Sequence, residues 1–356
     1  MAFNLLRRLK DYDDLDLSVV LLNEGRLADE LTSIGVNVHV VDEKTNSFQK
    51  IYQKTREIIG HTPPNIIHSH RYKENLLALL ISRFCRGVKL VSTQHGLPEF
   101  HQTKPGINQK IKTFTNFWTL SSFFTTVAVS KDIRNVLVNR FGFRKERVDV
   151  IYNGIELPSL PYACGDKTGP FVIGSSGRLF PVKDYPLMIE IAQTIAATGK
   201  VDIRFELAGD GPEQRALEAL VQDHGLNSDF IFKGHQDDML PFYQGLDIYL
   251  NTSLHEGIPM TILEALSFSL PVIAPAVGGI VEIIENGKEG FLIDSRTSND
   301  FAEKCLFLKN REERKKMARA ARDKAEQVFS ASRMAEDYHQ LYRRITNRAG
   351  DELNLN

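Results

Sequence analysis

The sequence predicts an α/β protein of two domains, each built on a parallel sheet. The first observation is length, since 356 residues are about twice a typical single domain. The second is a regular alternation of short Val- and Ile-rich runs with helical segments, the pattern of strands joined by crossover helices. The third is a break at 157–170, where three prolines and two glycines interrupt that alternation. A Rossmann-like domain is therefore expected on each side of the break.

The expected strands are apolar runs that end in small or polar residues. In the first domain they lie at 15–23, 36–42, 65–70, 88–96, 124–130 and 147–154. In the second domain they lie at 169–178, 203–211, 229–235, 246–253, 270–279 and 290–294. Helices are expected between them, as at 185–200 and 213–225, where apolar residues recur three and four positions apart and glycine stands near the C-terminal end.

The two ends of the chain depart from this plan. Residues 2–12 are helix-like, whereas a doubly wound domain opens with an apolar strand and a glycine-rich turn. The first domain is therefore expected to lack its first strand. A helix is also expected at 333–348, and its place at the end of the chain lets it pack back onto the first domain. The expected domains are 1–158, with that helix able to join it, and 159–332.

Composition points to a cytoplasmic chain. The cysteines, Cys85, Cys164 and Cys305, are odd in number and widely spaced, which fits neither a disulfide framework nor a zinc site and favours a reducing compartment. The N-terminus has basic residues but no apolar core of a secretory signal behind them. The longest apolar run, 117–129, is too short to span a bilayer. Attachment at the inner face of the membrane is the most that these features allow.

Charge is unevenly divided along the chain. Residues 1–160 contain 22 Lys and Arg against 16 Asp and Glu, and the rest contains 22 against 29, giving net charges of +6 and −7. A basic first half suits an anionic membrane surface or an anionic acceptor, although chance scatter of surface charge explains it equally. The segment 111–124, which mixes lysine with aromatic residues, is either a lipid-contacting helix or one packed on the first sheet.

Ligands of open parallel sheets bind at the carboxyl ends of strands, and several loops there carry polar groups. His95 follows the strand at 88–94, and its imidazole could hydrogen-bond a polyol or serve a structural role. His68 and His70 also end a strand, and for them the structural role is favoured. Arg178 and Lys183 follow a glycine-rich turn, where two cations suit a diphosphate; a solvated basic loop is the alternative.

The stretch HEGIPMTILEAL, 255–266, predicts a helix N-terminus that binds an anion. Pro259 suits the first turn of a helix, and Gly257 leaves the preceding loop open to close approach. The N–H groups of Ile258 and Met260 would then point out of the helix toward a ligand.

Two carboxylates flank this helix start. Glu256 lies in the loop before the helix, and Glu264 lies between one and two turns inside it. They should therefore face different parts of one extended ligand, without sharing a proton or a metal. A carboxylate accepts two hydrogen bonds at once, which suits the vicinal hydroxyls of a ribose or a hexose.

The run E-G-x-P-x-x-x-x-E-A, followed by LPVIAPAVGGIVEII and NGKEGFLID, resembles the donor site of glycosyltransferase family 4. This is a large retaining family with the GT-B fold, two Rossmann-like domains facing a cleft. VIYNGIE, SSGRLFPVKDY, LAGDGPE, IFKGH and AVSKDI also match, so the resemblance covers roughly residues 20–345. The order and spacing of these motifs together are highly specific.

The resemblance implies a role for each matching residue. Glu256 would bind the hydroxyls of the donor sugar, Arg178 and Lys183 would neutralise the departing diphosphate, and His95 would face the sugar from the opposite domain. Glu264 would bind the ribose. The remaining expected substrate-binding residues, which contact the sugar, the phosphates or the base, are Gly177, Gly234, His235, Gly257, Ile258, Pro259 and Met260.

The implied activity is transfer of a hexosyl or N-acetylhexosaminyl group from a nucleotide-diphosphate sugar, with UDP first, to a glycan or lipid-linked acceptor. Synthesis of a surface polysaccharide or lipopolysaccharide is the implied setting, with no metal, cofactor or nucleic acid involved. An inactive homologue that binds the nucleotide sugar, or a phosphorylase on the same fold, is the alternative. Asp11 and Asp13 formally match a metal-binding D-x-D, but the acidic stretch around them suggests a solvated turn.

Overall fold

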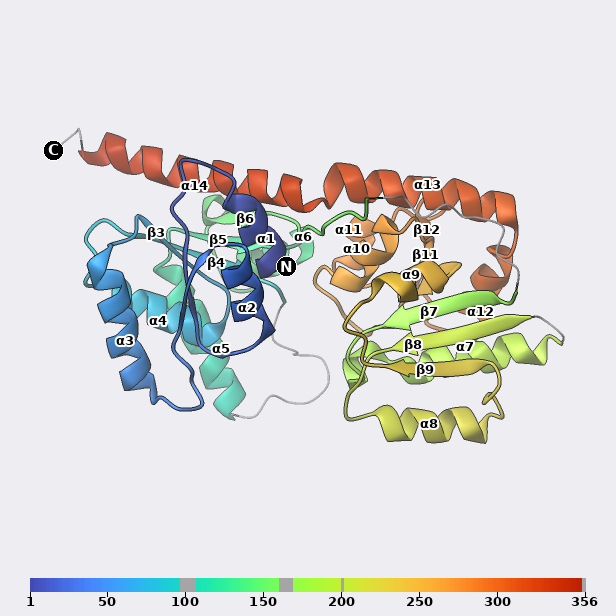
Figure 1. Ribbon diagram of the computed structural model, residues 1–356. Helices are drawn as coiled ribbons and strands as arrows, with labels where there is room; N and C mark the ends of the chain where they lie inside the picture. Colours follow the sequence, from blue (N-terminus) through green and yellow to red (C-terminus); the bar gives the residue numbers. More distant parts are fainter. Residues whose placement is uncertain (97–106, 160–168, 200–201, 354–356) are drawn as a thin grey trace. The chain divides into compact units, whose positions relative to one another are not determined.

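The computed structural model describes residues 1–96, 107–159, 169–199 and 202–353, with the side chains of 107–113 and 348–353 excepted. It divides into two compact units, drawn in Figure 1. Unit 1 combines Met1–Gly154 with Ala331–Asn356, and unit 2 is Ile155–Ser330. The first boundary thus lies four residues, and the second two residues, before the expected positions. Within the boundary segment, 160–168, with Cys164, lies outside the described residues.

Unit 2 is built on a six-stranded parallel sheet. Its strands are β7 (Phe171–Ser176), β8 (Ile203–Ala208), β9 (Phe230–Gly234), β10 (Ile248–Leu250), β11 (Val272–Pro275) and β12 (Gly290–Ile293). Their spatial order is β12-β11-β10-β7-β8-β9, the order of a doubly wound fold. The chain runs outward from β7 through β8 to β9 and then returns to start again at β10. The strand order therefore reverses between β7 and β10, and ligands of doubly wound folds bind outside the carboxyl ends of the strands at such a point.

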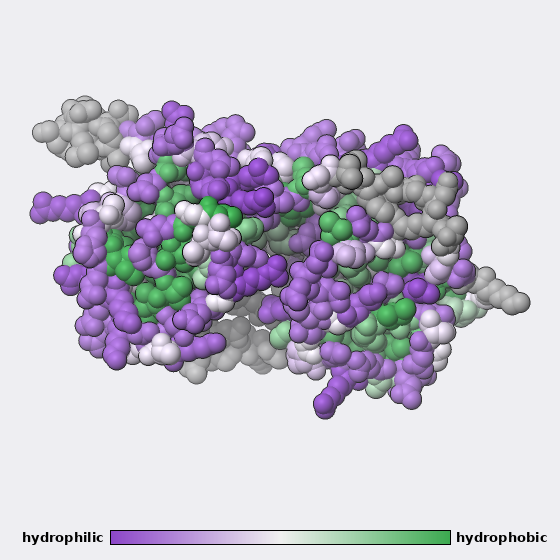
Figure 2. Space-filling view, viewed as in Figure 1, coloured by the Kyte–Doolittle hydropathy of each residue, from purple (hydrophilic) through white to green (hydrophobic). Residues whose placement is uncertain are grey.

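Helices cover the sheet of unit 2 and close its core. They are η2 (Pro181–Lys183), α7 (Tyr185–Ala197), α8 (Gln214–Asp223), α9 (Leu240–Gly245), α10 (Met260–Ser267), α11 (Ile280–Ile283), α12 (Ser298–Phe307) and α13 (Arg311–Val328). Helix α7 is apolar over most of its circumference, and Met188, Ile189 and Ile191 are completely buried. Most of the surface drawn in Figure 2 is hydrophilic, and apolar residues show only in separate patches on each unit.

Unit 1 holds two parallel sheets where the sequence suggested one. Strands β1 (Ser18–Leu21) and β2 (Asn37–Val40) form a pair. Strands β3 (Ile66–Ser69), β4 (Lys89–Gln94), β5 (Thr125–Ala128) and β6 (Val148–Val150) form the second sheet in that order. A doubly wound order would have one more strand between β1 and β3, and the described residues form no such strand. As a result, no hydrogen-bonded ladder joins β1 to β3 in the described part of the chain, and the strands form two separate sheets.

Helices surround both sheets of unit 1. They are α1 (Ala2–Leu9), α2 (Arg26–Ser33), α3 (Phe48–His61), α4 (Tyr72–Ser82), α5 (Ile107–Ser121), α6 (Lys131–Asn139), η1 (Lys145–Arg147) and α14 (Ala331–Leu353). Nowhere in the described ranges does a helix have the length and apolar character needed to cross a membrane.

The C-terminal helix α14 completes the core of unit 1. Its apolar positions are all buried and join one cluster with the α1 leucines, Val91 of β4, Val127 of β5 and Ile151 after β6; they are Met334, Tyr338, Leu341 and Ile345. Their spacing of three and four residues places them on one face of the helix. Burial of each large side chain stabilises this docking by about 1.5–3 kcal/mol.

A polar link fastens the same helix to the ends of β3 and β4. Nδ1 of His68 lies 2.6 Å from the hydroxyl oxygen of Tyr342, and Nε2 lies 2.8 Å from Oγ1 of Thr93. Thr93 in turn shares a 2.8 Å hydrogen bond with the hydroxyl of Tyr338. Burial lowers the pKa of His68 to about 3, with a smaller contribution from His95. The imidazole is therefore neutral at pH 7, with one ring nitrogen donating and the other accepting.

Replacing His68 by glutamine, which does not titrate, tests this link. An imidazole that is neutral when folded but protonated when unfolded makes the free energy of unfolding fall as pH drops below about 6.5 toward about 3. The wild-type curve should be steeper than that of His68→Gln by up to about 1.4 kcal/mol per pH unit in this window. Urea unfolding of unit 1, followed against pH, measures the difference. His39→Gln on β2 is the control, and parallel curves for wild type and His68→Gln would contradict the link.

Candidate active site

The ends of β7 and β10 bring together most of the residues expected to bind the donor. Strand β7 ends at Ser176 and leads directly into Gly177 and Arg178. Strand β10 ends at Leu250 and leads into a turn whose next three residues, 251–253, are buried polar side chains. Ile173 and Gly174 of β7 pair with Ile248 and Tyr249 of β10. The two loops therefore start side by side at the topological switch of the sheet.

Lys183 and Glu256 form an ion pair at this edge. Nζ of Lys183 lies 2.6 Å from Oε1 of Glu256, and both side chains are largely shielded, with 21% and 14% exposed. The Ser253 hydroxyl donates a second hydrogen bond to the same carboxylate oxygen, at 2.7 Å. The Thr252 hydroxyl donates to the backbone carbonyl of Lys183 and holds η2 against the turn after β10. An ammonium has three donors, so Lys183 keeps two for the oxygens of a ligand.

Two glycines after β11 hold the turn that carries Glu256. The N–H of Gly279 donates to the carbonyl of Glu256 at 3.0 Å. A Cβ on Gly279 would lie 1.7 Å from the carbonyl oxygen of Gly257, and one on Gly278 would lie 2.1 Å from that of Glu256. Gly278 also has a φ of +51°, in the left-handed region. These glycines serve the close approach of two backbones.

Helix α10 begins at Met260, one residue later than expected from placing Pro259 in its first turn. Pro259 occupies the N-cap position with φ −70° and ψ 118°, and its carbonyl accepts from Ile262 and Leu263. The N–H groups of Met260 and Thr261 fall in the first turn, where no helix carbonyl can accept from them. They form the positive end of the helix beside Glu256 and suit an anionic ligand.

Glu264 lies inside α10 in a network of hydroxyls. Its Oε2 accepts from the Tyr243 hydroxyl at 2.6 Å, and that hydroxyl is 3.1 Å from Oγ of Ser176. The Ser176 hydroxyl also lies 3.2 Å from that of Tyr249. Burial raises the pKa of the Glu264 carboxyl, and the hydrogen bond from Tyr243 partly offsets this. Oε1 of Glu264 has no hydrogen-bond partner among the described residues, which leaves it available to a ligand.

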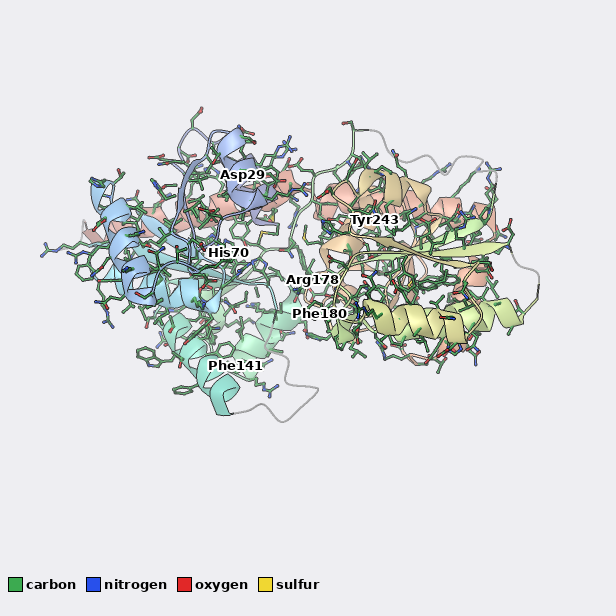
Figure 3. The ribbon with its side chains drawn as sticks, turned by 60° about the horizontal axis from the view of Figure 1, so that its bottom comes forward. Asp29, His70, Phe141, Arg178, Phe180 and Tyr243 are labelled. Carbon is green, nitrogen blue, oxygen red and sulfur yellow. The ribbon has the colours of Figure 1, made fainter. Side chains whose placement is uncertain are left out.

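Arg178, on the loop after β7, lies beside Phe180, as Figure 3 shows. Its guanidinium carbon is 5.0 Å from the centroid of that ring, and no carboxylate pairs with it among the described residues.

Gly234 ends the edge strand β9, which is separated from β7 by β8, and has a φ of +65°. His235 follows and is exposed, with Nε2 3.6 Å from the Asp237 carboxylate.

Several residues that hold the site were given no role in the sequence analysis. Arg296 donates to the carbonyls of Thr252 and Ser253, each at 2.9 Å, and pairs with Asp184. Asp184 and Arg296 both have left-handed backbones, with φ of 49° and 53°, a strained conformation for residues other than glycine. A lone arginine after β12 gives no sign of these partners in the sequence. Tyr243 and Ser176 could have been suspected only from the strand order.

His95 belongs to unit 1 and lies with two other histidines. Its Nε2 is 3.0 Å from Nδ1 of His70, whose ring stacks on His68 at 4.5 Å between centroids. His95 is exposed, and His70 is half-buried at the end of β3, where Figure 3 marks it. Burial, helped by the nearby His68 and His95, holds the pKa of His70 well below its usual range.

Metal ligation is not built into the described residues, since no group of three His, Cys, Asp or Glu side chains among them is arranged to hold an ion. Asp11 and Asp13 lie in the turn after α1, and neighbouring Asp14 bonds to His339 of α14 at 2.8 Å.

Family models cover nearly the whole chain. The model for Glycosyltransferase Family 4 matches residues 1–158, and the model for Glycosyl transferases group 1 matches residues 164–324. An Escherichia coli protein, UDP-Gal:alpha-D-GlcNAc-diphosphoundecaprenol alpha-1,3-galactosyltransferase, is 24% identical over 78% of this chain and 75% of its own. The N-acetyl-alpha-D-glucosaminyl L-malate synthase of Bacillus anthracis is 24% identical over 81% of this chain and 77% of its own.

Solved structures share the fold. The Anabaena protein HepE in complex with UDP matches with a TM-score of 0.80 at 21% identity, over 96% of this chain and 95% of that one. Sucrose-phosphate synthase from Thermosynechococcus elongatus matches with a TM-score of 0.77 at 17% identity, over 96% and 92%. The fold is therefore GT-B, with two Rossmann-like domains in tandem. With a family model on each half and the donor-site motifs placed at one sheet edge, the chain belongs to glycosyltransferase family 4.

Proposed function

We propose that this glycosyltransferase moves a hexosyl or N-acetylhexosaminyl group from a UDP-sugar to a glycan or lipid-linked acceptor, with retention and without a metal. The arrangement that carries the proposal is Lys183–Glu256 on one side of the α10 N-terminus and Glu264 inside it. The relative named as a UDP-galactose transferase and the HepE complex with UDP support the choice of nucleotide. The setting is synthesis of a polysaccharide or lipopolysaccharide in the cytoplasm.

The ribose and the transferred sugar of the donor bind to different carboxylates. Glu264 binds the ribose hydroxyls through Oε1, because Tyr243 already occupies Oε2. Glu256 binds hydroxyls of the transferred sugar through Oε2, because Lys183 and Ser253 both bond to Oε1. Gly234 and His235 lie beside the base, and His95 contacts the sugar.

Positive groups stabilise the leaving diphosphate. Arg178 supplies a guanidinium fork, Lys183 a compact ammonium, and the first turn of α10 its free N–H groups. Gly177 and the stretch from Gly257 to Met260 let the backbone approach the phosphates and the sugar. The bond from the anomeric carbon to the phosphate oxygen breaks, and the acceptor oxygen bonds to the same face of that carbon. The acceptor's proton passes to the departing phosphate, so no metal is required for charge balance.

The first test is turnover itself. Purified protein is screened for UDP-sugars that raise its melting temperature, and UDP release is then followed with glycan and lipid-linked acceptors. UDP should appear only when an acceptor is present, equally with and without EDTA, and the product should keep the donor's anomeric configuration by NMR. A requirement for manganese would contradict the metal-free mechanism, and inversion would contradict retention. Tight UDP-sugar binding with no transfer to any acceptor would favour the inactive homologue.

The second test concerns the ribose. Glu264→Ala removes the free carboxylate oxygen and should weaken UDP binding by about 1–3 kcal/mol, a rise in Kd of roughly 5- to 150-fold. Titration calorimetry with UDP measures it. Glu190→Ala removes an exposed carboxylate from α7 of the same unit and is the matched control. Equal UDP affinity in Glu264→Ala and wild type would remove Glu264 from the ribose site.

We also propose that unit 1 contacts an anionic membrane surface. Phe117 and Leu120 of α5 are buried, as expected for a helix packed on the sheet, but Phe114 and Trp118 are 74% and 56% exposed. They stand four positions apart and share one face of the helix. An exposed aromatic pair of this kind suits the interface between lipid and water.

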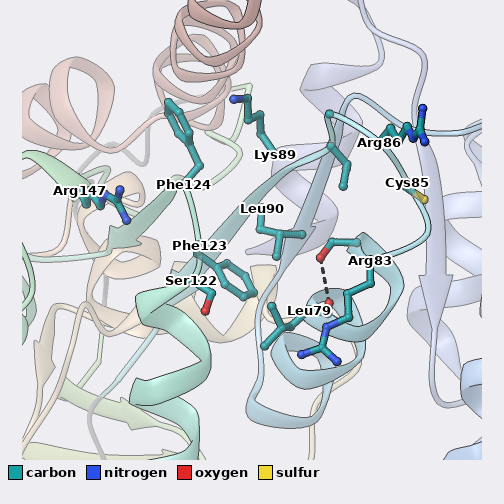
Figure 4. Close-up of a pocket in the computed structure, with 13 residues that line it drawn as sticks. Leu79, Arg83, Cys85, Arg86, Lys89, Leu90, Ser122, Phe123, Phe124 and Arg147 are labelled. Atoms are coloured by element: carbon teal, nitrogen blue, oxygen red, sulfur yellow. Dashed lines mark hydrogen bonds between the residues drawn. The ribbon is translucent and has the colours of Figure 1, made fainter.

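A cationic pocket of about 440 Å³ lies past the end of the same helix, at the amino end of β4 (Figure 4). Arg83, Arg86, Lys89 and Arg147 line it, and no Asp or Glu is among its described lining residues. These side chains account for much of the basic excess of the first half of the chain. Arg83, Arg86 and Arg147 are exposed, which suits contact with lipid phosphates, each worth about 1 kcal/mol near a charged surface.

Vesicle sedimentation tests the membrane contact. Wild type should sediment with phosphatidylcholine vesicles that contain phosphatidylglycerol and stay in solution with phosphatidylcholine alone, and salt should weaken the binding. The combined variant Arg83→Gln, Arg86→Gln, Arg147→Gln should lose most of it. Lys309→Gln, Lys316→Gln, Arg319→Gln removes the same charge from unit 2 and should keep it. Equal sedimentation of the two triple variants would refute a role for this pocket.

A further inference from the structure

We propose that His70 is a positioning residue: it accepts a hydrogen bond from Nε2–H of His95 and thereby fixes the tautomer that His95 presents to a sugar hydroxyl. The 3.0 Å contact from Nδ1 of His70 to Nε2 of His95 carries this inference. It rests on the proposed role of His95 in the transfer site, and it gives His70 a function beyond the structural one that the sequence favoured.

For two neutral imidazoles to share such a bond, one of the two facing nitrogens must carry a proton and the other must not. If both carried a proton on the facing nitrogens, they would repel each other, and if neither did, no hydrogen bond would form. The pKa of His70 is held well below its usual range by burial. The pKa of His95 is lowered to about 4, first by the protein that surrounds its ring on the sides not exposed to solvent and second by the nearby amino terminus and Arg71. Both rings are therefore neutral at pH 7, and one must donate while the other accepts.

The direction of the bond follows from tautomer chemistry. A neutral histidine side chain in water prefers its proton on Nε2. Only with His95 as the donor do both rings adopt this form, since His70 then accepts at Nδ1 and keeps a proton on its own Nε2. Nδ1 of His95 is then a lone-pair acceptor on an exposed residue. A hydroxyl of the donor or acceptor sugar is the complementary group, because it can donate to that lone pair.

The imidazole of His95 is supported by a stack of two further imidazoles, those of His70 and His68. His68 stacks on His70 with centroids 4.5 Å apart and planes at 28°, and His70 stacks on His95 at 5.3 Å and 19°. His68 is itself fixed at both ring nitrogens by Tyr342 and Thr93. The backbone N–H of His70 contacts the Glu74 carboxylate at 3.4 Å. Exposed His95 therefore rests on a stack whose far end is anchored to α14.

Imidazole ¹⁵N NMR tests the proposal without relying on activity. In wild-type protein at pH 7, His95 should show a protonated Nε2 and an unprotonated Nδ1, and His70 should show the same pair of states. His70→Phe keeps a flat ring but removes the acceptor, so His95 should become a mixture of tautomers. His70→Asn places an amide oxygen near the position of Nδ1 and should restore the single tautomer. His39→Phe, elsewhere in unit 1, is the control and should leave the His95 signals unchanged.

Kinetics then shows whether the tautomer matters to transfer. His70→Phe should lower kcat roughly 10- to 100-fold through misplacement of His95, with KM for the donor little changed, and His70→Asn should recover most of the loss. An unprotonated Nε2 on His95 in wild type, or an unchanged His95 tautomer in His70→Phe, would overturn the proposal. Full activity in His95→Ala would instead refute the proposed role of His95 and leave the NMR result on the pair intact.

Discussion

The pairing of β7 with β10 is the constraint on which the donor side of this protein depends. These strands lie next to each other in the sheet although about seventy residues separate them in the chain, as the doubly wound order requires. Gly174 makes the contact possible, because a Cβ there would lie 2.3 Å from the side chain of Leu246 ahead of β10. With the strands in register, Ser176 reaches Tyr243 and Tyr249, and Lys183 reaches Glu256. The contacts of Ser176 and of the Lys183–Glu256 pair both depend on this ladder.

The two glutamates of the site have different surroundings and therefore different chemistry. Glu256 is paired with an ammonium and keeps its negative charge close to a positive one. Glu264 has only neutral hydroxyl partners, and burial raises the pKa of its carboxyl. A raised pKa makes this carboxylate a more basic hydrogen-bond acceptor at neutral pH. The difference supports the proposal that Glu256 binds a sugar next to a diphosphate and Glu264 an uncharged ribose.

Sequence reasoning found the fold, the family and the glycine–proline turn because each leaves a local pattern. Alternating strands and helices predict parallel sheets, and Gly257, Pro259 and the two glutamates stand within one short stretch. Arg296 and Tyr243 could not be found this way, since their partners lie 44 and 21 residues away and depend on tertiary packing. The separation of the unit 1 strands into two sheets could not be predicted either, because the spacing of apolar residues predicts strands but not their order in a sheet. For His70 the sequence favours a structural role, since its contact with His95 forms only when β3 and β4 pair.

Helix α14 has a further consequence for how this chain is made. Unit 2 is one continuous stretch, Ile155–Ser330, so it can fold as soon as that stretch has been synthesised. Unit 1 needs Leu5 and Leu9 from the beginning of the chain and Leu341 and Ile345 from near its end. Its apolar strands therefore stay partly uncovered until α14, which follows unit 2 along the chain, has been made. Unit 1 therefore completes its core after unit 2, although its strands come earlier along the chain.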